Sequence, residues 1–255
     1  MVNNRKALLT ASVVYASEIL KCLADGVERL TDITHRLKLN KATVFRLLKT
    51  LESSGLALQD PRNKRYYLGP LILQLASKPT ISHERLIIYA FDEMKRLRDL
   101  NNETVALHIR VGAQRIILEE MPSTQNIRFT LGKGFASSMY IGAAAKLLLS
   151  ELPESEREMY LNGVKLINPR TNEIIDKEAL INELNKIKKE GYAISWDETI
   201  QGSAGISVPI RNYVFLVALS MYGPKDRFMP HKMSYLQELK ESAERISRKL
   251  LEMGA

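Results

Sequence analysis

Basic side chains are concentrated between Arg36 and Arg65. This stretch holds eight Lys and Arg residues against only two acidic residues, Glu52 and Asp60. Clustered cations neutralise phosphates and release counterions, which supplies the sequence-independent part of affinity for DNA. We therefore expect a nucleic-acid interface here. Its candidate residues are Lys41, Thr43, Phe45, Arg46 and Lys49, followed by Arg62, Lys64 and Arg65.

The helical period explains how the first five of these residues share one face. In the same segment Val44, Leu47, Leu48 and Leu51 fall at i, i+3, i+4 and i+7, an apolar stripe that faces inward. Asn40 is placed to cap this helix and Gly55 to end it, while Thr31 is the expected cap of a preceding helix. Residues 30 to 58 thus read as a helix-turn-helix, with helix 41 to 54 in the major groove. The alternative is an ordinary helical hairpin with a solvated outer face, and the basic bias argues against it.

The last three basic residues belong to a predicted β-hairpin. Residues 56–59 and 64–68 favour short strands around the turn-forming tip Asp60-Pro61-Arg62-Asn63. Cations at the tip of such a wing suit contact with backbone phosphates. Phe45 has two interpretations: it contacts thymine methyl groups, or it covers the local core against the wing.

The distribution of charge indicates two domains. Of the net charge of +8, residues 1–79 carry +7, with 13 Lys and Arg against 6 Asp and Glu. Residues 80–255 carry 24 against 23. A basic module joined to a nearly neutral one is typical of a DNA-binding domain with a second domain that has another task. We expect a winged helix-turn-helix in 1–79, a linker or dimerisation helix in 80–103, and the second domain in 104–255.

The residue types that mark other classes of protein are scarce. Cys22 is the single cysteine and lies in an apolar segment, so a disulfide framework or a cysteine metal site is excluded. The first 30 residues lack the apolar region of a signal peptide, and no stretch reaches the roughly 18–20 apolar residues of a membrane span. We expect a soluble, cytoplasmic protein that does not contact membranes. His83, His108 and His231 are too widely separated for a catalytic or metal constellation, so no catalytic residue, metal or cofactor is predicted.

Periodicity along the rest of the chain predicts mixed α and β structure. A first helix over 8–25 would turn Val13, Val14 and Ile19 inward, and helices at 71–77 and 82–100 would bridge the domains. Helix 82–100, whose apolar stripe runs from Leu86 to Leu100, or the helix before it is also a candidate dimer surface. Strands are predicted at 104–110, 115–120, 127–131, 192–195, 204–210 and 214–221, and further helices at 141–150, 153–161, 176–189 and 230–253. Hairpin links between the strands indicate an α+β domain with an antiparallel sheet.

Several segments carry a family resemblance in a fixed order. They are LTDITHRLKLNKATVFRLLKTLESSGL, DPRNKRYYLGPLILQLA, LRDLNNETVALHIRVGAQRIILEEM, GYAISWDETIQGSAGISVPI and LSMYGP. In these the chain resembles the IclR family of transcriptional regulators. The resemblance implies an effector-binding C-terminal domain related to GAF and PAS sensors, and a homodimer or homotetramer on DNA. Before one helix the family tends to have Pro-Leu-His-x-Thr-Ala-x-Gly-Lys, whereas this chain has Tyr140 at the His position and Ala145 at the Gly, so a more apolar pocket is expected.

The resemblance also implies where an effector would bind. A sensor needs a largely apolar cavity with a few convergent polar groups. Ser220 and Tyr222, two apart on a strand, share a face and would line such a cavity together or not at all. The alternative for Ala143 and Ala144 is close helix packing, and for Asp197 and Glu198 a solvated loop. The implied positions are Met139, Gly142, Ala143, Ala144, Asp197, Glu198, Gly205, Ser220 and Tyr222.

Three classes of function remain open from the sequence. The favoured class is a regulator that binds an inverted-repeat operator in double-stranded DNA as a homo-oligomer and responds to a small organic effector. The second is a DNA-binding protein whose C-terminal domain only oligomerises. The third, an enzyme with a basic appendage, has little support: Gly132-x-Gly134 is a fragment of a phosphate-binding loop without its third glycine.

Overall fold

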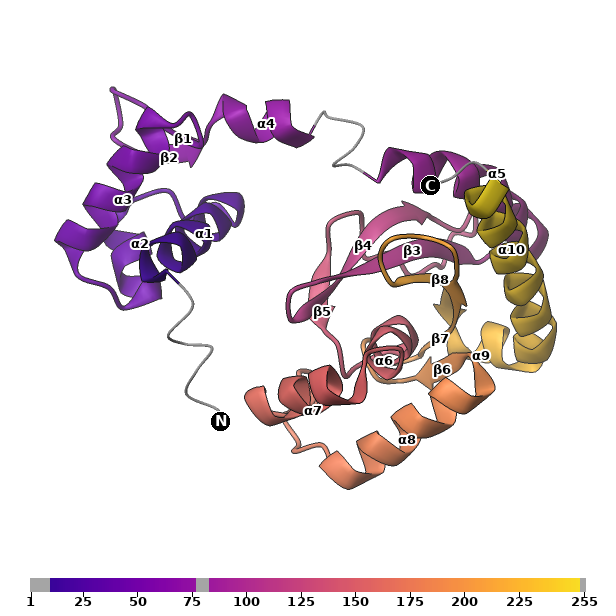
Figure 1. Ribbon diagram of the computed structural model, residues 1–255. Coiled ribbons are helices and arrows are strands. Elements are labelled where there is room, and N and C mark those ends of the chain that lie inside the picture. Colours follow the sequence, from indigo (N-terminus) through magenta and orange to yellow (C-terminus); the bar gives the residue numbers. More distant parts are fainter. Residues whose placement is uncertain (1–9, 77–82, 253–255) are drawn as a thin grey trace. The chain divides into compact units, whose positions relative to one another are not determined.

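A computed structural model describes residues 10–76 and 83–252 and divides the chain into two compact units, Met1–Ser82 and His83–Ala255 (Figure 1). The predicted pairing of a winged helix-turn-helix with an α+β domain is confirmed. The first unit contains α1 (Ala11–Ala24), α2 (Leu30–Leu37), α3 (Lys41–Ser53), β1 (Ala57–Gln59), β2 (Tyr66–Leu68) and α4 (Pro70–Ala76). Residue 77 of the predicted helix 71–77 and residue 82 of the predicted helix 82–100 lie outside the described residues.

The core of the first unit forms where the apolar stripes of its three leading helices meet. Val44, Leu48 and Leu51 of α3 are buried, as the helical period predicts. They pack with Ile19 of α1 and Ile33 of α2, and the wing covers the remaining side. Helix packing of this kind stabilises a small domain mainly by removing apolar surface from water.

The ends of the helices show which local predictions hold. Asn40 caps α3, because its Oδ1 accepts a hydrogen bond of 2.8 Å from the Ala42 N–H. Gly55 takes the left-handed conformation predicted for the stop, with φ of +75°. The prediction for Thr31 is wrong: α2 already begins at Leu30, and the Thr31 hydroxyl donates to Asp32 Oδ1 instead.

Two further positions of α1 differ from expectation. Val13 and Val14 are 64% and 40% exposed, so the first turns of α1 do not contribute to the core. The segment is apolar on more than one side, and only the side that includes Ile19, Cys22 and Leu23 meets the other helices.

The second unit is built on one antiparallel sheet with the strand order β5-β4-β3-β8-β7-β6. Its strands are β3 (Thr104–Val111), β4 (Gln114–Met121), β5 (Ala136–Ser138), β6 (Ala193–Trp196), β7 (Ser203–Ile210) and β8 (Val217–Pro224). Its helices are α5 (Glu84–Asn101), α6 (Ala143–Ser150), α7 (Glu154–Gly163), α8 (Lys177–Glu190), α9 (Lys225–Phe228), a 3-10 turn at Met229–His231, and α10 (Lys232–Glu252). The curled sheet with helices on both faces is consistent with the expected GAF- and PAS-like class.

Separate apolar clusters cover the two faces of this sheet. On one face α5 and α10 pack on β3, β7 and β8, with Leu97, Leu107 and Leu239 fully buried. On the other face α6 lies against the sheet and packs on α8, as Figure 1 shows. Leu147 and Leu184 belong to the buried apolar cluster on this side. The N-terminal end of α6 is thereby fixed over the middle strands.

The third predicted strand, at Ile127–Leu131, is wrong. The N–H groups of Leu131 and Gly132 donate to the Glu120 carboxylate at 3.0 Å each, instead of to a neighbouring strand. The chain then turns through Gly132 and Gly134, both at positive φ, and bonds to Ile117 of β4 from Gly134 and Phe135 before β5 pairs with β4 at Ala136–Ser138. A β-rich composition favoured a strand here, but a side chain distant in sequence takes the hydrogen bonds.

Helix α5 packs within the second unit. Leu86, Ala90, Met94 and Leu97 are fully buried against the sheet and α10, so these four residues of the predicted stripe belong to the core of this unit. The prediction that this helix contacts a partner subunit stays a prediction. The apolar side chains that α5 leaves exposed are Ile88, Phe91 and Leu100.

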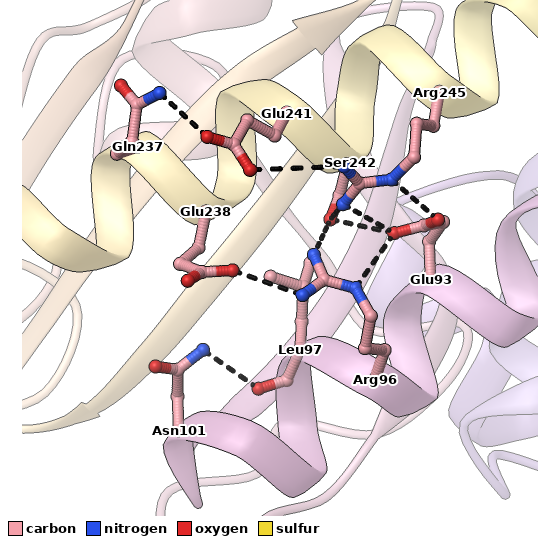
Figure 2. A network of polar contacts seen from close by, with 9 residues as sticks. All are labelled: Glu93, Arg96, Leu97, Asn101, Gln237, Glu238, Glu241, Ser242 and Arg245. Carbon is pink, nitrogen blue, oxygen red and sulfur yellow. Dashed lines mark hydrogen bonds and ion pairs between the residues drawn. The ribbon is translucent and has the colours of Figure 1, made fainter.

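A polar network also ties α5 to α10 (Figure 2). The Glu93 carboxylate accepts hydrogen bonds from Arg245 (2.8 Å), Ser242 (3.0 Å) and Arg96 (3.2 Å), and Arg96 reaches Glu238 at 3.1 Å. By its contacts α5 belongs to the second unit rather than to a linker of its own.

Candidate functional site

The outer face of α3 carries the residues predicted to contact DNA. Lys41, Phe45, Arg46 and Lys49 are exposed, and Thr43 is half-buried. Phe45 is 45% exposed and lies outside the core of the first unit, with the Lys49 ammonium 5.9 Å from its ring centroid. A large aromatic side chain that is open to solvent beside cations suits a surface that meets a partner.

The wing tip is shaped by two local side-chain turns. Asp60 Oδ1 accepts from the Arg62 N–H and Asn63 Oδ1 from the Arg65 N–H, each at 2.8 Å. Lys64 sits between them with φ of +59°. Arg62 and Lys64 are exposed and form no ion pair among the described residues, so their charges are free to meet phosphates.

Two of the predicted cations are already engaged within the protein. Arg65 donates to Glu28 at 2.9 Å, and the Tyr66 N–H donates to the Glu28 carbonyl at 2.8 Å, which braces the wing against the loop before α2. Lys49 pairs with Glu52 at 2.7 Å, and this hydrogen bond raises the pKa of Lys49. Lys41 and Arg46 have no such partner among the described residues.

A cavity lies in the second unit, between the sheet and the N-terminal end of α6. Its volume is about 70 Å³, several times the roughly 10–15 Å³ that one water requires. Six of the nine predicted effector positions line it: Gly142, Ala143, Ala144, Gly205, Ser220 and Tyr222. The other lining residues are His108, Arg115, Phe129, Leu131, Ile141, Ala145, Ser195, Thr199, Ile200, Ser203, Ala204, Ile206, Ser207 and Met221.

The remaining three predicted effector positions lie outside this lining. Met139 is fully buried in the apolar cluster beneath α6, and its N–H donates to the Tyr160 hydroxyl. Asp197 pairs with Lys225 and accepts from the Gly202 N–H at 2.7 Å, and its hydrogen bond with Lys225 lowers its pKa.

Glu198 has a bracing position. It accepts from the Gly142 N–H at 2.8 Å and from Lys146 at 2.6 Å, and thus fixes the entrance of α6 without lining the cavity. Both carboxylates are half-buried and bonded, so the alternative of a solvated loop does not describe them either.

Small residues bring α6 close to the sheet. Gly142 has φ of +86°, and the Ala143 N–H donates to Ser195 Oγ at 2.9 Å. Ala143 and Ala144 are buried in the apolar cluster and also line the cavity. Both alternatives therefore apply to them: they pack the helix and they border the cavity. Across from them, Ser207 Oγ and Ser220 Oγ share a hydrogen bond of 2.7 Å.

The cavity wall beside β8 is held by Tyr222. Its hydroxyl bonds to Glu120, the residue that also anchors Leu131 and Gly132. Burial and then this hydrogen bond raise the pKa of Tyr222, so the phenol stays neutral. Ser220 and Tyr222 line the cavity together, as their spacing predicts.

Sequence reasoning missed His108 and Arg115. Arg115, 4% exposed, donates from Nε and Nη2 to Ser137 Oγ at 3.1 and 2.7 Å and contacts His108 Nδ1 from Nη1 at 3.1 Å. Burial lowers the pKa of Arg115 to about 10, which leaves it charged at neutral pH. The cavity is therefore less apolar than expected. The sequence did carry a signal, because Arg115 lies two residues before Ile117 on β4 and both positions are buried.

Other kinds of site lack support in the described part of the chain. Residues 10–76 and 83–252 contain no group of three or more His, Cys, Asp or Glu arranged to hold a metal ion. Within the same ranges no helix is both long enough and apolar enough to cross a membrane. Gly132 and Gly134 belong to the loop before β5, and the Gly132 N–H is occupied by Glu120.

Comparison with known proteins accounts for both units. The family model described as the IclR helix-turn-helix domain matches residues 12–61. The model described as the bacterial transcriptional regulator IclR C-terminal domain matches residues 79–248. The chain belongs to the IclR family. The IclR-family proteins that it matches are DNA-binding transcriptional regulators, and the winged helix-turn-helix and cavity described above correspond to the two matched domains.

Individual relatives extend over most of the chain. The HTH-type transcriptional regulator KipR of Bacillus subtilis (strain 168) is 32% identical over 226 residues, 87% of this chain and 89% of KipR. An IclR transcriptional regulator from Alicyclobacillus acidocaldarius superposes with a TM-score of 0.71 at 26% identity, over 94% of this chain and 98% of that one. An IclR homolog from Microbacterium hydrocarbonoxydans, complexed with 4-hydroxybenzoate, superposes with a TM-score of 0.73 over 94% and 99% of the two chains; at 22% identity this likeness concerns the fold.

Proposed function

We propose that this IclR-family regulator binds an inverted-repeat operator as a homodimer or homotetramer, and that a small organic ligand in the cavity changes its affinity for that operator. The proposal rests on one observation: the same chain has an exposed basic winged helix-turn-helix in its first unit and a cavity in its second unit. No catalytic residue is assigned, because the relatives reported above are named as regulators.

The DNA-binding half follows from α3 and the wing. Arg46 and Phe45, exposed on α3, are the proposed readers of base edges, and Arg62 and Lys64 at the wing tip are the proposed phosphate contacts. Two copies of the domain would read half-sites about 34 Å apart, one turn of DNA, or a multiple of that distance. A protein that acts on DNA in this way is expected in the cytoplasm.

The ligand-binding half follows from the cavity. Its apolar walls give affinity, and its few polar side chains, Ser207, Ser220 and Tyr222 among them, fix the orientation of a ligand. A ligand affects DNA binding only if it binds the DNA-competent arrangement and the incompetent arrangement with different affinities. Such couplings are typically about 5- to 150-fold in affinity.

Two measurements test this function. An operator is selected from random DNA with the full-length protein, and its affinity is measured by fluorescence anisotropy with and without compounds that raise the melting temperature. The proposal predicts sequence-selective binding and a compound that changes operator affinity at least fivefold. Binding that shows no sequence preference, or an operator affinity that no stabilising compound changes, would overturn it.

A further inference from the structure

A six-residue loop, residues 197–202, forms one wall of the cavity and is called the strap below. It joins β6 to β7, and its residues Thr199 and Ile200 line the cavity together with Ser203 at the start of β7. A Cβ added to Gly142, at the start of α6, would lie 3.0 Å from the Thr199 hydroxyl oxygen. The strap therefore lies directly against the N-terminal end of α6.

The two ends of the strap are fixed to each other and to α9. Asp197 and Gly202 have positive φ, +57° and +77°, and the Gly202 N–H donates to Asp197 Oδ1 at 2.7 Å. Lys225, the first residue of α9, pairs with the Asp197 carboxylate and donates its own N–H to the Gly202 carbonyl at 2.7 Å. These bonds hold the base of the strap, so the part that is able to move is residues 198–201.

Glu198 holds this part of the strap to α6. Its carboxylate accepts from the Gly142 N–H at 2.8 Å and from the Lys146 ammonium at 2.6 Å. Lys146 has a second partner, because it also pairs with Glu183 of α8 at 2.5 Å. The side chain of Lys146 is 4% exposed, whereas those of Glu198 and Glu183 are 29% and 41% exposed. A buried cation is thus shared by two half-buried carboxylates from different elements.

Two carboxylates on one buried cation allow one of them to leave. A buried charge that loses its last partner is strongly unfavourable. When Glu198 leaves, Lys146 keeps Glu183, so no buried charge is left without a partner, while Glu198 and the Gly142 N–H turn to water. Glu183 stays behind because it belongs to α8, which packs on α6.

We propose that the strap is a gate to the cavity, with Glu198 as its latch and Glu183 as the carboxylate that keeps Lys146 paired while the gate is open. This inference rests on the proposed function, since it describes how a ligand reaches the cavity. Loops that close over a binding site move about a few residues at their ends. Release of Glu198 lifts Thr199 and Ile200 from the cavity and opens this wall.

The first test measures access to the cavity without ligand or DNA. Ser220→Cys places a thiol in the cavity lining. Its rate of reaction with methyl methanethiosulfonate is followed by peptide mass spectrometry, which separates it from the natural thiol of Cys22. In this background Glu198→Ala should raise the rate about 10- to 100-fold, the effect of losing hydrogen bonds to a charged group. An unchanged rate overturns the proposal.

Glu183→Ala is the matched variant, because it removes the other carboxylate from the same lysine. With Glu198 as its last partner, Lys146 should hold the strap more firmly, so the rate should fall about 2- to 10-fold. General loosening of this region would instead raise the rate in both variants. Opposite changes are therefore expected, and a rate that rises or stays the same in Glu183→Ala contradicts the proposal.

The Gly142 amide provides a second measurement that does not need the introduced thiol. Its N–H donates to Glu198 only while the gate is closed, so its hydrogen exchange, followed by NMR, should be slower in Glu183→Ala than in the parent. Equal or faster exchange overturns the proposal, even if Ser220→Cys fails to fold.

These outcomes separate the gate from the regulatory role. Opposite effects of the two variants on access, with no ligand that changes operator affinity, would leave the gate standing and remove the regulatory proposal. A ligand that changes operator affinity, with no effect of Glu198→Ala on access, would do the reverse.

Discussion

The wing tip gives a quantitative prediction about DNA binding. Arg62 and Lys64 are exposed and form no ion pair among the described residues, so each is expected to contact one phosphate. Each such contact contributes about 0.9 to the slope of log affinity against log salt concentration. The variant that carries both Arg62→Ala and Lys64→Ala should therefore flatten the slope by about 1.8.

This change of slope is large enough to measure directly. Between 50 and 200 mM salt, a slope smaller by about 1.8 means that the variant loses about 12-fold less affinity than the parent. The assay is fluorescence anisotropy with the selected operator and with a random duplex, at four salt concentrations. Because phosphate contacts carry no sequence information, both duplexes should show the same change.

Two single variants make the test specific. Arg65→Ala should flatten the slope by less than about one unit, since its guanidinium is held by Glu28. Lys21→Ala, which removes an exposed cation of α1 that pairs with Glu18, should leave the slope unchanged. An unchanged slope in the double variant, or an equal change in Lys21→Ala, would show that the wing tip does not contact DNA.

Three further predictions concern base reading and stability. Phe45→Ala should fold normally but select a different operator from random DNA, and an unchanged operator would exclude Phe45 as a reader. Gly69→Ala should lower the free energy of unfolding of the first unit by about 1–3 kcal/mol, because a Cβ there would lie 2.2 Å from the Gly55 carbonyl oxygen; denaturant titration checks this, with Gly26→Ala as the control for strain without a clash. Glu93→Gln should destabilise the second unit at pH 7: burial raises the pKa of Glu93, but hydrogen bonds from Arg245 and its neighbours outweigh burial and leave it below 4.5. The stabilisation by Glu93 is thus present above pH 4.5 and is lost as pH falls through the folded-state pKa. The free energies of unfolding of parent and variant should therefore converge in acid. A difference that stays constant with pH would contradict this.

The parts of the fold that the sequence predicts are those controlled by local patterns. The inward stripe of Val44, Leu48 and Leu51 and the cap at Asn40 depend on residues within one or two turns, and both are found. The stripe of α5 was also found, but periodicity shows only that a face is apolar and not which surface covers it. Most of this stripe covers the core of its own unit, and the dimer contact of the helix stays a prediction.

The cavity was predictable only in part for a related reason. The resemblance correctly indicates which backbone segments border the cavity, such as those at Gly142 and Gly205. They do not show that Glu198 turns toward Lys146, since that bond joins residues 52 apart in sequence. Arg115 was missed because its place in the cavity wall depends on its contacts with Ser137 and His108, which lie on other strands, and only the folded chain shows these contacts.

The most direct test of the account is the affinity of the full-length protein for its selected operator, with and without a saturating ligand found by titration. The account predicts a change of about 5- to 150-fold in the parent, and a change by the same factor in ligand affinity when operator is present. It also predicts that the response is diminished in Ser220→Ala, whose hydroxyl lines the cavity. Equal operator affinities with and without bound ligand in the parent would contradict the claim that this cavity controls DNA binding.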